Sequence, residues 1–218
     1  MPIRRYPLRT NYVYHVFNRG VAKQTVFHDD LDYLHFIEAI DYYRPRDQKI
    51  PLSIYRRNQT PGVKNQGFVE TNVEILAFCL MPNHFHLMLR QTSENGISHF
   101  LANVTNSYTR SYNTRYSRIG PLFQGPFKAV WVETDEQLIH LSRYIHLNPV
   151  VAGLAQKPEA YHWSSYNAYL SKSNEFRTIC DPLLILALFT KQDKYQLFIN
   201  NHLDYARSLE TLKHAILD

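Results

Sequence analysis

The sequence predicts an α+β fold of the ferredoxin-like split βαβ type, with an antiparallel sheet, helices on one face and a C-terminal helical extension. Apolar residues alternate in short segments rich in β-branched and aromatic residues, and they recur at helical spacing in longer segments. These segments follow the order strand, helix, strand, strand, helix, strand, helix. Of the 218 residues, 44% are hydrophobic and 20% are charged, which is the composition of a globular domain.

The first half of the chain contains a predicted strand, a helix and a hairpin. Residues 12–19 alternate and predict a strand. Asp29 and Asp30 precede a helical pattern, and acidic residues suit a first turn because of the helix dipole. Residues 73–80 and 84–90 predict an antiparallel hairpin, since the Met81-Pro82-Asn83 segment between them has turn chemistry. The apolar residues of the predicted helix are Leu31, Leu34, Ile37 and Ile40.

The second half continues with a long amphipathic helix over residues 98–116, a loop rich in Gly and Pro, and a strand over residues 127–133. Thr134 to Gln137 form a capping box that begins another helix, and Pro149 is expected to end it. The polar segment at about residues 44–72 contains Pro45, Pro51 and Pro61 and predicts an insertion or a long hairpin loop.

These patterns predict one domain over residues 1–170, which includes the inserted segment, and a helical extension over residues 171–218. Cys79 and Cys180 are two lone cysteines, which excludes a disulfide framework or a thiolate zinc site and suits a reducing cytoplasm. No apolar run approaches the roughly 20 residues that span a bilayer, and no secretory signal follows the basic N-terminus. We therefore expect a cytoplasmic, nucleoid-associated protein without a membrane partner.

The net charge of +5 is unevenly distributed. No acidic residue precedes Asp29, and none occurs between Asn95 and Val132, although both segments contain arginines. Cations that neutralise phosphates, interleaved with rings that stack on bases, are what single-stranded nucleic acid needs. An amphipathic helix with aromatic core residues and a solvated basic face explains the same pattern. The aromatic residues of the second segment are Phe100, Tyr108, Tyr112, Tyr116 and Phe123.

The segment His84-Phe85-His86 lies in a predicted strand. Because side chains alternate along a strand, both imidazoles point to one face and Phe85 points to the other. Two neutral imidazoles on one face can bind one divalent cation. The alternative is a pair of half-buried histidines that are hydrogen-bonded to the backbone.

Tyr144 and Asn148 are four residues apart in a predicted helix and therefore share one face. Tyr144 offers a phenol that can attack once deprotonated, and Asn148 offers a carbonyl oxygen that suits Mg²⁺ or Mn²⁺. His140, one turn earlier, is a candidate to orient or deprotonate the phenol, or else to make a surface hydrogen bond. The alternative for the pair is a core tyrosine and a C-cap asparagine before Pro149.

Several segments resemble the single-tyrosine transposases that carry a His-hydrophobic-His signature, and in particular their REP-associated branch. Residues 78–89 (FCLMPNHFHLML) contain that signature. The other similar segments, in order along about three quarters of the chain, are YHVFNRG at 14–20, LFQG at 122–125, SRYIHLNPV at 142–150 and WSSY at 163–166.

The resemblance implies a metal-dependent DNA strand transferase on a ferredoxin-like fold. In such an enzyme His84, His86 and Asn148 would hold Mg²⁺ or Mn²⁺ at the scissile phosphate of single-stranded or hairpin DNA. Tyr144 would attack that phosphate and leave a 5′-phosphotyrosine link and a free 3′-hydroxyl. The protein would act as a monomer or homodimer. The expected DNA contacts are Arg4, Arg5, Arg19, Arg110, Arg115, Arg118, Lys128 and Arg143.

Two features depart from the family pattern. Pro126 stands where family members usually have Arg after the LFQG segment, which removes a cation and a backbone donor. The segment at about residues 44–72 is absent from compact members and is either an additional DNA-contacting hairpin or a solvated loop. Two other functions therefore stay open: a hydrolytic metal nuclease, and a DNA- or RNA-binding module without catalysis.

Overall fold

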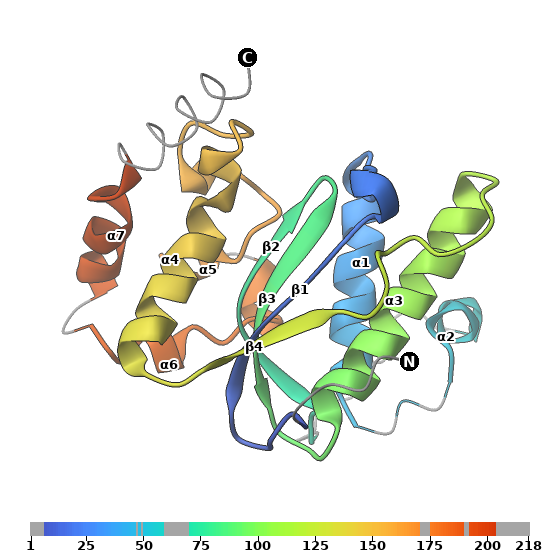
Figure 1. Cartoon of the computed structure of the whole chain (residues 1–218), viewed down its shortest axis with the longest axis horizontal. Coiled ribbons are helices and arrows are strands. Elements are labelled where there is room, and N and C mark those ends of the chain that lie inside the picture. The colour runs from blue at the N-terminus through green and yellow to red at the C-terminus, as the bar shows by residue number, and fades with distance from the viewer. Residues whose placement is uncertain are drawn as a thin grey trace.

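The computed structural model describes residues 7–46, 48, 50–58, 70–170, 175–189 and 192–203. Among these residues, four strands form an antiparallel sheet in the order β2-β3-β1-β4 (Figure 1). This order confirms the predicted ferredoxin-like arrangement, because β3 separates β1 from β2. The strands are β1 (Val13–Arg19), β2 (Val73–Met81), β3 (His84–Gln91) and β4 (Lys128–Val132).

Helices α1 (Asp30–Tyr43) and α3 (Gly96–Arg115) lie together on one face of the sheet (Figure 1). Asp29 caps α1, since its side chain accepts a hydrogen bond from the backbone N–H of Asp32. The predicted apolar stripe of α1 is only half correct, because Leu31 and Leu34 are exposed. Aromatic residues of α1 are buried instead of these two leucines. The buried side chains of α1 include Tyr33, Phe36, Ile37 and Ile40.

Helix α4 (Asp135–Val151) packs against β2 and β3 on the opposite face from α1 and α3 (Figure 1). Helices therefore cover both faces of the sheet, and the predicted placement of all helices on one face is wrong. Thr134 caps it as predicted, accepting from the N–H of Gln137, while the Gln137 side chain accepts from the N–H of Glu133 at 2.7 Å. The prediction that Pro149 ends this helix is wrong, because α4 continues to Val151. Pro149 is buried and loses only its own N–H bond, whereas Gly153, with φ of +67°, allows the chain to leave the helix.

The inserted segment contains a helix that the sequence did not predict, α2 (Leu52–Asn58). Leu52 is buried, and its N–H donates a hydrogen bond of 3.0 Å to the hydroxyl of Tyr43 at the end of α1. An antiparallel bridge between Pro45 and Thr71 closes the base of the insertion, as expected for a hairpin-like excursion. The predicted loop is therefore partly helical, and a contact with α1 holds the helix in place.

The segments after α4 cover the outer side of that helix and the free edge of β2. Backbone bonds of 2.9 Å from Leu80 to Trp163 and of 3.0 Å from Ser165 to Phe78 attach residues 163–165 to β2. Among the described residues, no helix is long and apolar enough to cross a bilayer. The short elements are η1 (Val21–Lys23), η2 (Pro158–Ala160), α5 (Tyr166–Tyr169), η3 (Glu175–Thr178), α6 (Leu183–Leu186) and α7 (Gln192–Asn200).

Candidate active site

His84 and His86 project from β3 toward the face that α4 covers, and their ring centres are 4.9 Å apart. Phe85 between them is buried on the opposite face, where its ring packs against Phe36 and Phe123 at 5.2 and 5.6 Å. The alternation predicted from the strand period is therefore correct.

His15 on β1 completes the imidazole cluster. Its Nε2 lies 2.9 Å from Nδ1 of His86, and the two rings stack with centres 5.1 Å apart. The antiparallel register pairs Phe17 with His86 and so brings this face of β1 beside the histidines of β3. Sequence spacing gave no role to His15. Alternation along residues 12–19 would have grouped it with Phe17 and Arg19, but only the strand pairing shows which face meets β3.

Tyr144 approaches these histidines from α4. Its ring centre lies 5.3 Å from that of His86 and 5.9 Å from that of His15, both nearly edge to face. The side chain is 50% exposed, and its hydroxyl makes no hydrogen bond to any other described residue. The ring is therefore held on one side by imidazoles, while half of the side chain stays open to an incoming group.

Asn148 lies one turn after Tyr144, inside α4 and not at its C-cap as the alternative interpretation required. The Nδ2 atom of its amide is buried and has no hydrogen-bond partner within the described part of the chain. A buried amide without a partner costs about 1–3 kcal/mol, so it indicates a polar group that the fold does not itself satisfy.

Burial lowers the pKa of all three histidines, because desolvation penalises the charged ring. The pKa of His15 falls to about 4 for this reason. The pKa of His84 falls to about 4 through burial and the nearby charge of Arg19, and that of His86 to about 2 through burial and the two other imidazoles. The cluster is therefore neutral at physiological pH, the state in which imidazole binds metal ions.

The ring nitrogens that face the protein are already engaged. His84 Nδ1 donates to Oδ1 of Asn83 at 2.5 Å, and His86 Nδ1 shares its bond with His15. These bonds leave the Nε2 atoms of His84 and His86 for another group, which is the usual arrangement of metal-binding histidines. Among the described residues, no group of three or more His, Cys, Asp or Glu side chains is arranged to hold a metal ion. The donor set thus depends on the Asn148 amide as well.

Two of the predicted DNA contacts border this face. Arg19 is exposed at the end of β1, in register with His84, and Lys128 is exposed on β4, in register with Phe17. Gly20 follows β1 and packs closely against the backbone of Gln24, because a Cβ atom at this position would lie 2.4 Å from the carbonyl oxygen of Gln24. The LFQG segment packs alongside, with the N–H of Gln124 bonded to the carbonyl of Arg19 at 2.7 Å.

Arg143 points away from Tyr144, toward α7. Its guanidinium donates to Nδ1 of His202 at 2.9 Å and to Nδ1 of His140 at 2.7 Å, and it lies 4.4 Å from the ring centre of Phe198. The structure therefore pairs His140 with Arg143 and not with the Tyr144 phenol, contrary to one hypothesis from the sequence.

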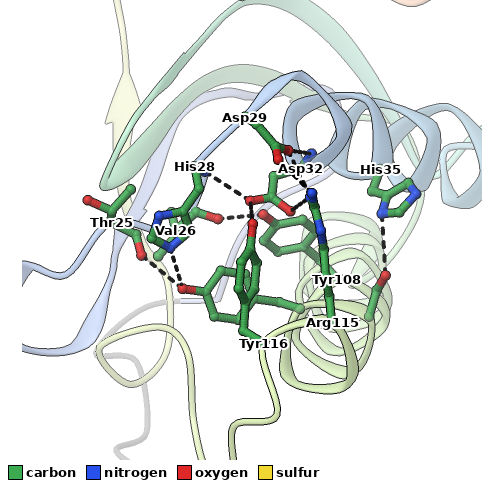
Figure 2. Close-up of polar contacts among 11 residues, drawn as sticks. Thr25, Val26, His28, Asp29, Asp32, His35, Tyr108, Arg115 and Tyr116 are labelled. Carbon is green, nitrogen blue, oxygen red and sulfur yellow. Dashed lines mark hydrogen bonds and ion pairs between the residues drawn. The ribbon is translucent and has the colours of Figure 1, made fainter.

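Arg115 belongs to an ion-pair network between α1 and α3 (Figure 2). Its guanidinium contacts Asp29 and lies 2.7 Å from the buried carboxylate of Asp32, which also accepts from the hydroxyl of Tyr116 at 2.8 Å. Arg118 donates to the carbonyls of Gly120 and Pro121 and so braces the following loop. Both arginines thus have internal partners.

The remaining predicted contacts are more open or cannot be placed. Arg110 is exposed on α3 and lines a cleft of about 660 Å³ between α2 and α3, on the face away from Tyr144. Arg4 and Arg5 lie outside the described residues. The proposal that the aromatic residues of the acid-free segment stack on bases is wrong for those in the core, which are Phe100, Tyr108, Tyr112 and Phe123.

Comparisons with known proteins agree with this geometry. Residues 58–148 match the model of the family described as "Transposase IS200 like", and this segment includes both β3 histidines, Tyr144 and Asn148. No curated protein matches the chain in sequence.

The fold is similar to a solved structure of a REP-associated tyrosine transposase bound to a REP hairpin, with a TM-score of 0.54. The two proteins share 16% sequence identity, and the match covers 79% of this chain and 86% of the other. The resemblance predicted from the motifs is therefore confirmed: residues 58–148 are similar to the IS200-like transposases, and the fold is similar to that of the solved transposase.

Proposed function

We propose that the protein is a metal-dependent endonuclease and strand transferase that acts on hairpin-bearing single-stranded DNA through a 5′-phosphotyrosine intermediate. The observation that supports this most directly is the position of Tyr144, half exposed and packed edge-on against His86. A nucleophile must be accessible to the substrate and close to the groups that position the reacting phosphate.

In this proposal the Tyr144 oxygen forms a bond to the scissile phosphorus and the bond to the 3′ oxygen breaks. The phenol proton passes to solvent, to which the side chain is open, and the departing 3′ oxygen takes up a proton to become a free hydroxyl. Attack of that or another 3′-hydroxyl on the phosphotyrosine reverses the step, joins DNA ends and regenerates the phenol. No bond energy is lost, so no nucleotide cofactor is required.

His84, His86 and Asn148 fit a divalent cation such as Mg²⁺ or Mn²⁺. The half-buried His84 and the buried His86 are neutral imidazoles with engaged Nδ1 atoms, and together with the carbonyl oxygen Oδ1 of Asn148 they make a suitable donor set. The unpartnered Nδ2 atom of Asn148 is a donor and would face an acceptor, not the cation. Such an ion would stabilise the negative charge that develops on the phosphate. His15 acts on this set through its hydrogen bond, which orients the His86 ring.

Arg19 and Lys128 are suited to hold the DNA backbone on either side of the histidine face, because both cations are exposed beside it. The solved transposase with a similar fold is bound to a REP hairpin, which favours a hairpin-bearing substrate here. A cytoplasmic, nucleoid-associated location and a monomeric or homodimeric state stay predictions.

The test is covalent capture of DNA. The full-length protein would be incubated with Mg²⁺ and a labelled single strand that contains a hairpin, then denatured in SDS and separated by electrophoresis. We expect a protein–DNA adduct that carries the 5′ phosphate and releases an extendable 3′-hydroxyl. Tyr144→Phe should eliminate both adduct and cleavage while DNA binding remains.

Tyr55→Phe is the matched control, because Tyr55 is also exposed but lies on α2. This variant should form the adduct like the wild type. Cleavage by Tyr144→Phe that leaves a free 5′ phosphate would instead assign the nucleophile to water and the protein to the hydrolytic nucleases. Binding without cleavage by the wild type would indicate a module without catalysis.

A further inference from the structure

Two exposed aromatic side chains form a pair at the edge of the sheet. Trp131 on β4 is 46% exposed and Tyr12, immediately before β1, is 36% exposed. Their ring centres lie 5.3 Å apart at an interplanar angle of 58°. Large rings that stay exposed beside one another are unusual in a protein that buries most of its other aromatic residues, so this pair suggests a binding surface.

The surroundings of this pair suit a ligand that carries both negatively charged phosphates and exposed bases. The guanidinium of Arg9 lies 5.9 Å from the ring centre of Tyr12. Both aromatic residues belong to segments without acidic residues, the first before Asp29 and the second from Asn95 to Val132. The nearest acidic residue in sequence is Glu133, which follows β4. Base–aromatic stacking beside a cation is the common mode of single-strand recognition.

Local bonds hold the pair in place. The N–H of Arg9 donates to the hydroxyl of Tyr14 at 2.8 Å, and the Gln91 side chain donates to the carbonyl of Leu8 at 2.9 Å. These bonds anchor the segment that precedes β1, and strand pairing places Trp131 opposite Tyr14. Both rings are thus presented by fixed backbone, which lowers the entropy cost of binding.

The pair lies at the edge of the sheet that carries the candidate active site, on the opposite face from the histidines. In the described sheet β4 is an edge strand that pairs with β1 alone, and its side chains alternate between the two faces. Lys128 and Val130 are exposed on the face of the histidines, since they pair in register with Phe17 and His15, while Trp131 projects to the other face. A single strand that leaves the histidine face across β4 therefore meets Lys128 and then Trp131.

We propose that Tyr12 and Trp131 form a stacking platform for an unpaired base of the single-stranded DNA that enters or leaves the active site. This inference rests on the proposed function, because it assumes that the protein binds single-stranded DNA. The platform would make binding depend on the presence of a base and not only on the charge of a phosphate.

Tryptophan fluorescence tests this contact directly. The chain has two tryptophans, and Trp163 is buried against Tyr33 with ring centres 4.5 Å apart, so it serves as an internal reference. A short oligodeoxythymidine strand should quench the emission of Trp131. An abasic strand with the same number of phosphates should bind more weakly and quench little. Equal quenching by the two strands would overturn the proposal.

Variants add an affinity measurement. Trp131→Leu should weaken binding of the oligodeoxythymidine about tenfold, whereas Trp131→Phe should retain most of the affinity. Tyr55→Leu alters an exposed ring on α2 that contacts Tyr42, and it should bind like the wild type. Circular dichroism and thermal unfolding would confirm that each variant folds.

Three other outcomes would overturn the stacking platform, and they differ in what they imply for the proposed function. Unchanged affinity of Trp131→Leu, with DNA bound and no quenching, would overturn the platform and leave the proposed function intact. Trp131 emission that changes with protein concentration without DNA would assign the pair to contact between two copies and overturn the proposal. No DNA binding at all by the wild type would overturn the proposed function together with this inference.

Discussion

Nε2 of His15 lies 2.9 Å from Nδ1 of His86, and the two imidazoles stack across neighbouring strands. The hydrogen bond couples the tautomers of the two rings, because one nitrogen must donate and the other accept, and the stacking limits rotation of the His86 ring. His15 contacts Tyr144 as well, with ring centres 5.9 Å apart. One side chain outside the proposed ligand set therefore supports both a proposed metal ligand and the proposed nucleophile.

This contact predicts a positioning role for His15. His15→Ala should lower the affinity for Mn²⁺ about tenfold, because the His86 ring loses the bond that orients it. Isothermal titration calorimetry with Mn²⁺ measures this without reference to activity. His15→Gln, which can still hydrogen-bond, should recover part of the affinity. Equal Mn²⁺ affinity in the wild type and His15→Ala would show that the bond does not orient a ligand.

Metal removal should separate cleavage from binding. EDTA or His86→Ala should abolish cleavage of the hairpin strand, since charge stabilisation at the phosphate depends on one ion, while binding depends on many contacts. Asn148→Ala should weaken Mn²⁺ affinity less than His84→Ala, because a neutral carbonyl is the weaker ligand. His99→Ala, an exposed change on α3, is the control. Cleavage by His86→Ala in EDTA would exclude the metal site.

The network around Asp32 should stabilise the fold without taking part in chemistry. Asp32→Ala leaves the N–H of His28 and the hydroxyl of Tyr116 without their acceptor, while Asp29 still engages Arg115. We expect a loss of about 2 kcal/mol in the free energy of unfolding, measured with urea. Asp30→Ala, an exposed change in the same turn, should cost much less. Both variants should still form the protein–DNA adduct when the assay temperature is roughly 20 °C below their thermal unfolding transition.

Acid should destabilise the protein through His146. Its ring is fully buried, bonded to the hydroxyls of Tyr195 and Ser165 at 2.7 and 2.8 Å, and burial lowers its pKa from 6.5 to about 3. Below pH 6.5 the unfolded chain therefore binds a proton that the native state does not. The contribution of His146 to the free energy of unfolding is fully present above that pH. It falls by about 1.4 kcal/mol per pH unit as the pH drops toward 3.

The check on this prediction is urea unfolding at pH 7 and pH 5, roughly the two sides of the unfolded-state value. His146→Gln should be less stable at neutral pH but should lose less stability on acidification. His99→Gln should keep the wild-type difference. A His146→Gln variant with the wild-type acid loss would place the proton uptake on His15, His84 or His86 instead.

Local patterns were sufficient for most of the sheet and for the start of each long helix. The alternation of residues 12–19, the turn at Pro82-Asn83 and the cap at Thr134 all depend on neighbours in sequence, and the structure agrees with each. Pro149 was misjudged because a proline inside a helix costs one hydrogen bond, and burial of the following turn offsets that cost. Helix α2 was missed because its contact with Tyr43 is not visible in its own composition.

The sequence by itself determined that His84 and His86 share one face of a strand and that Tyr144 and Asn148 share one face of a helix, because the strand and helix periods require it. Only the tertiary structure decided which faces meet. Antiparallel pairing of β1 with β3 brought His15 to His86, and the crossing of α4 brought Tyr144 to both. It also buried the aromatic stripe of α3 and left Tyr12 and Trp131 exposed. Periodicity fixes the direction of a side chain relative to its own element, whereas contacts between elements depend on long-range packing.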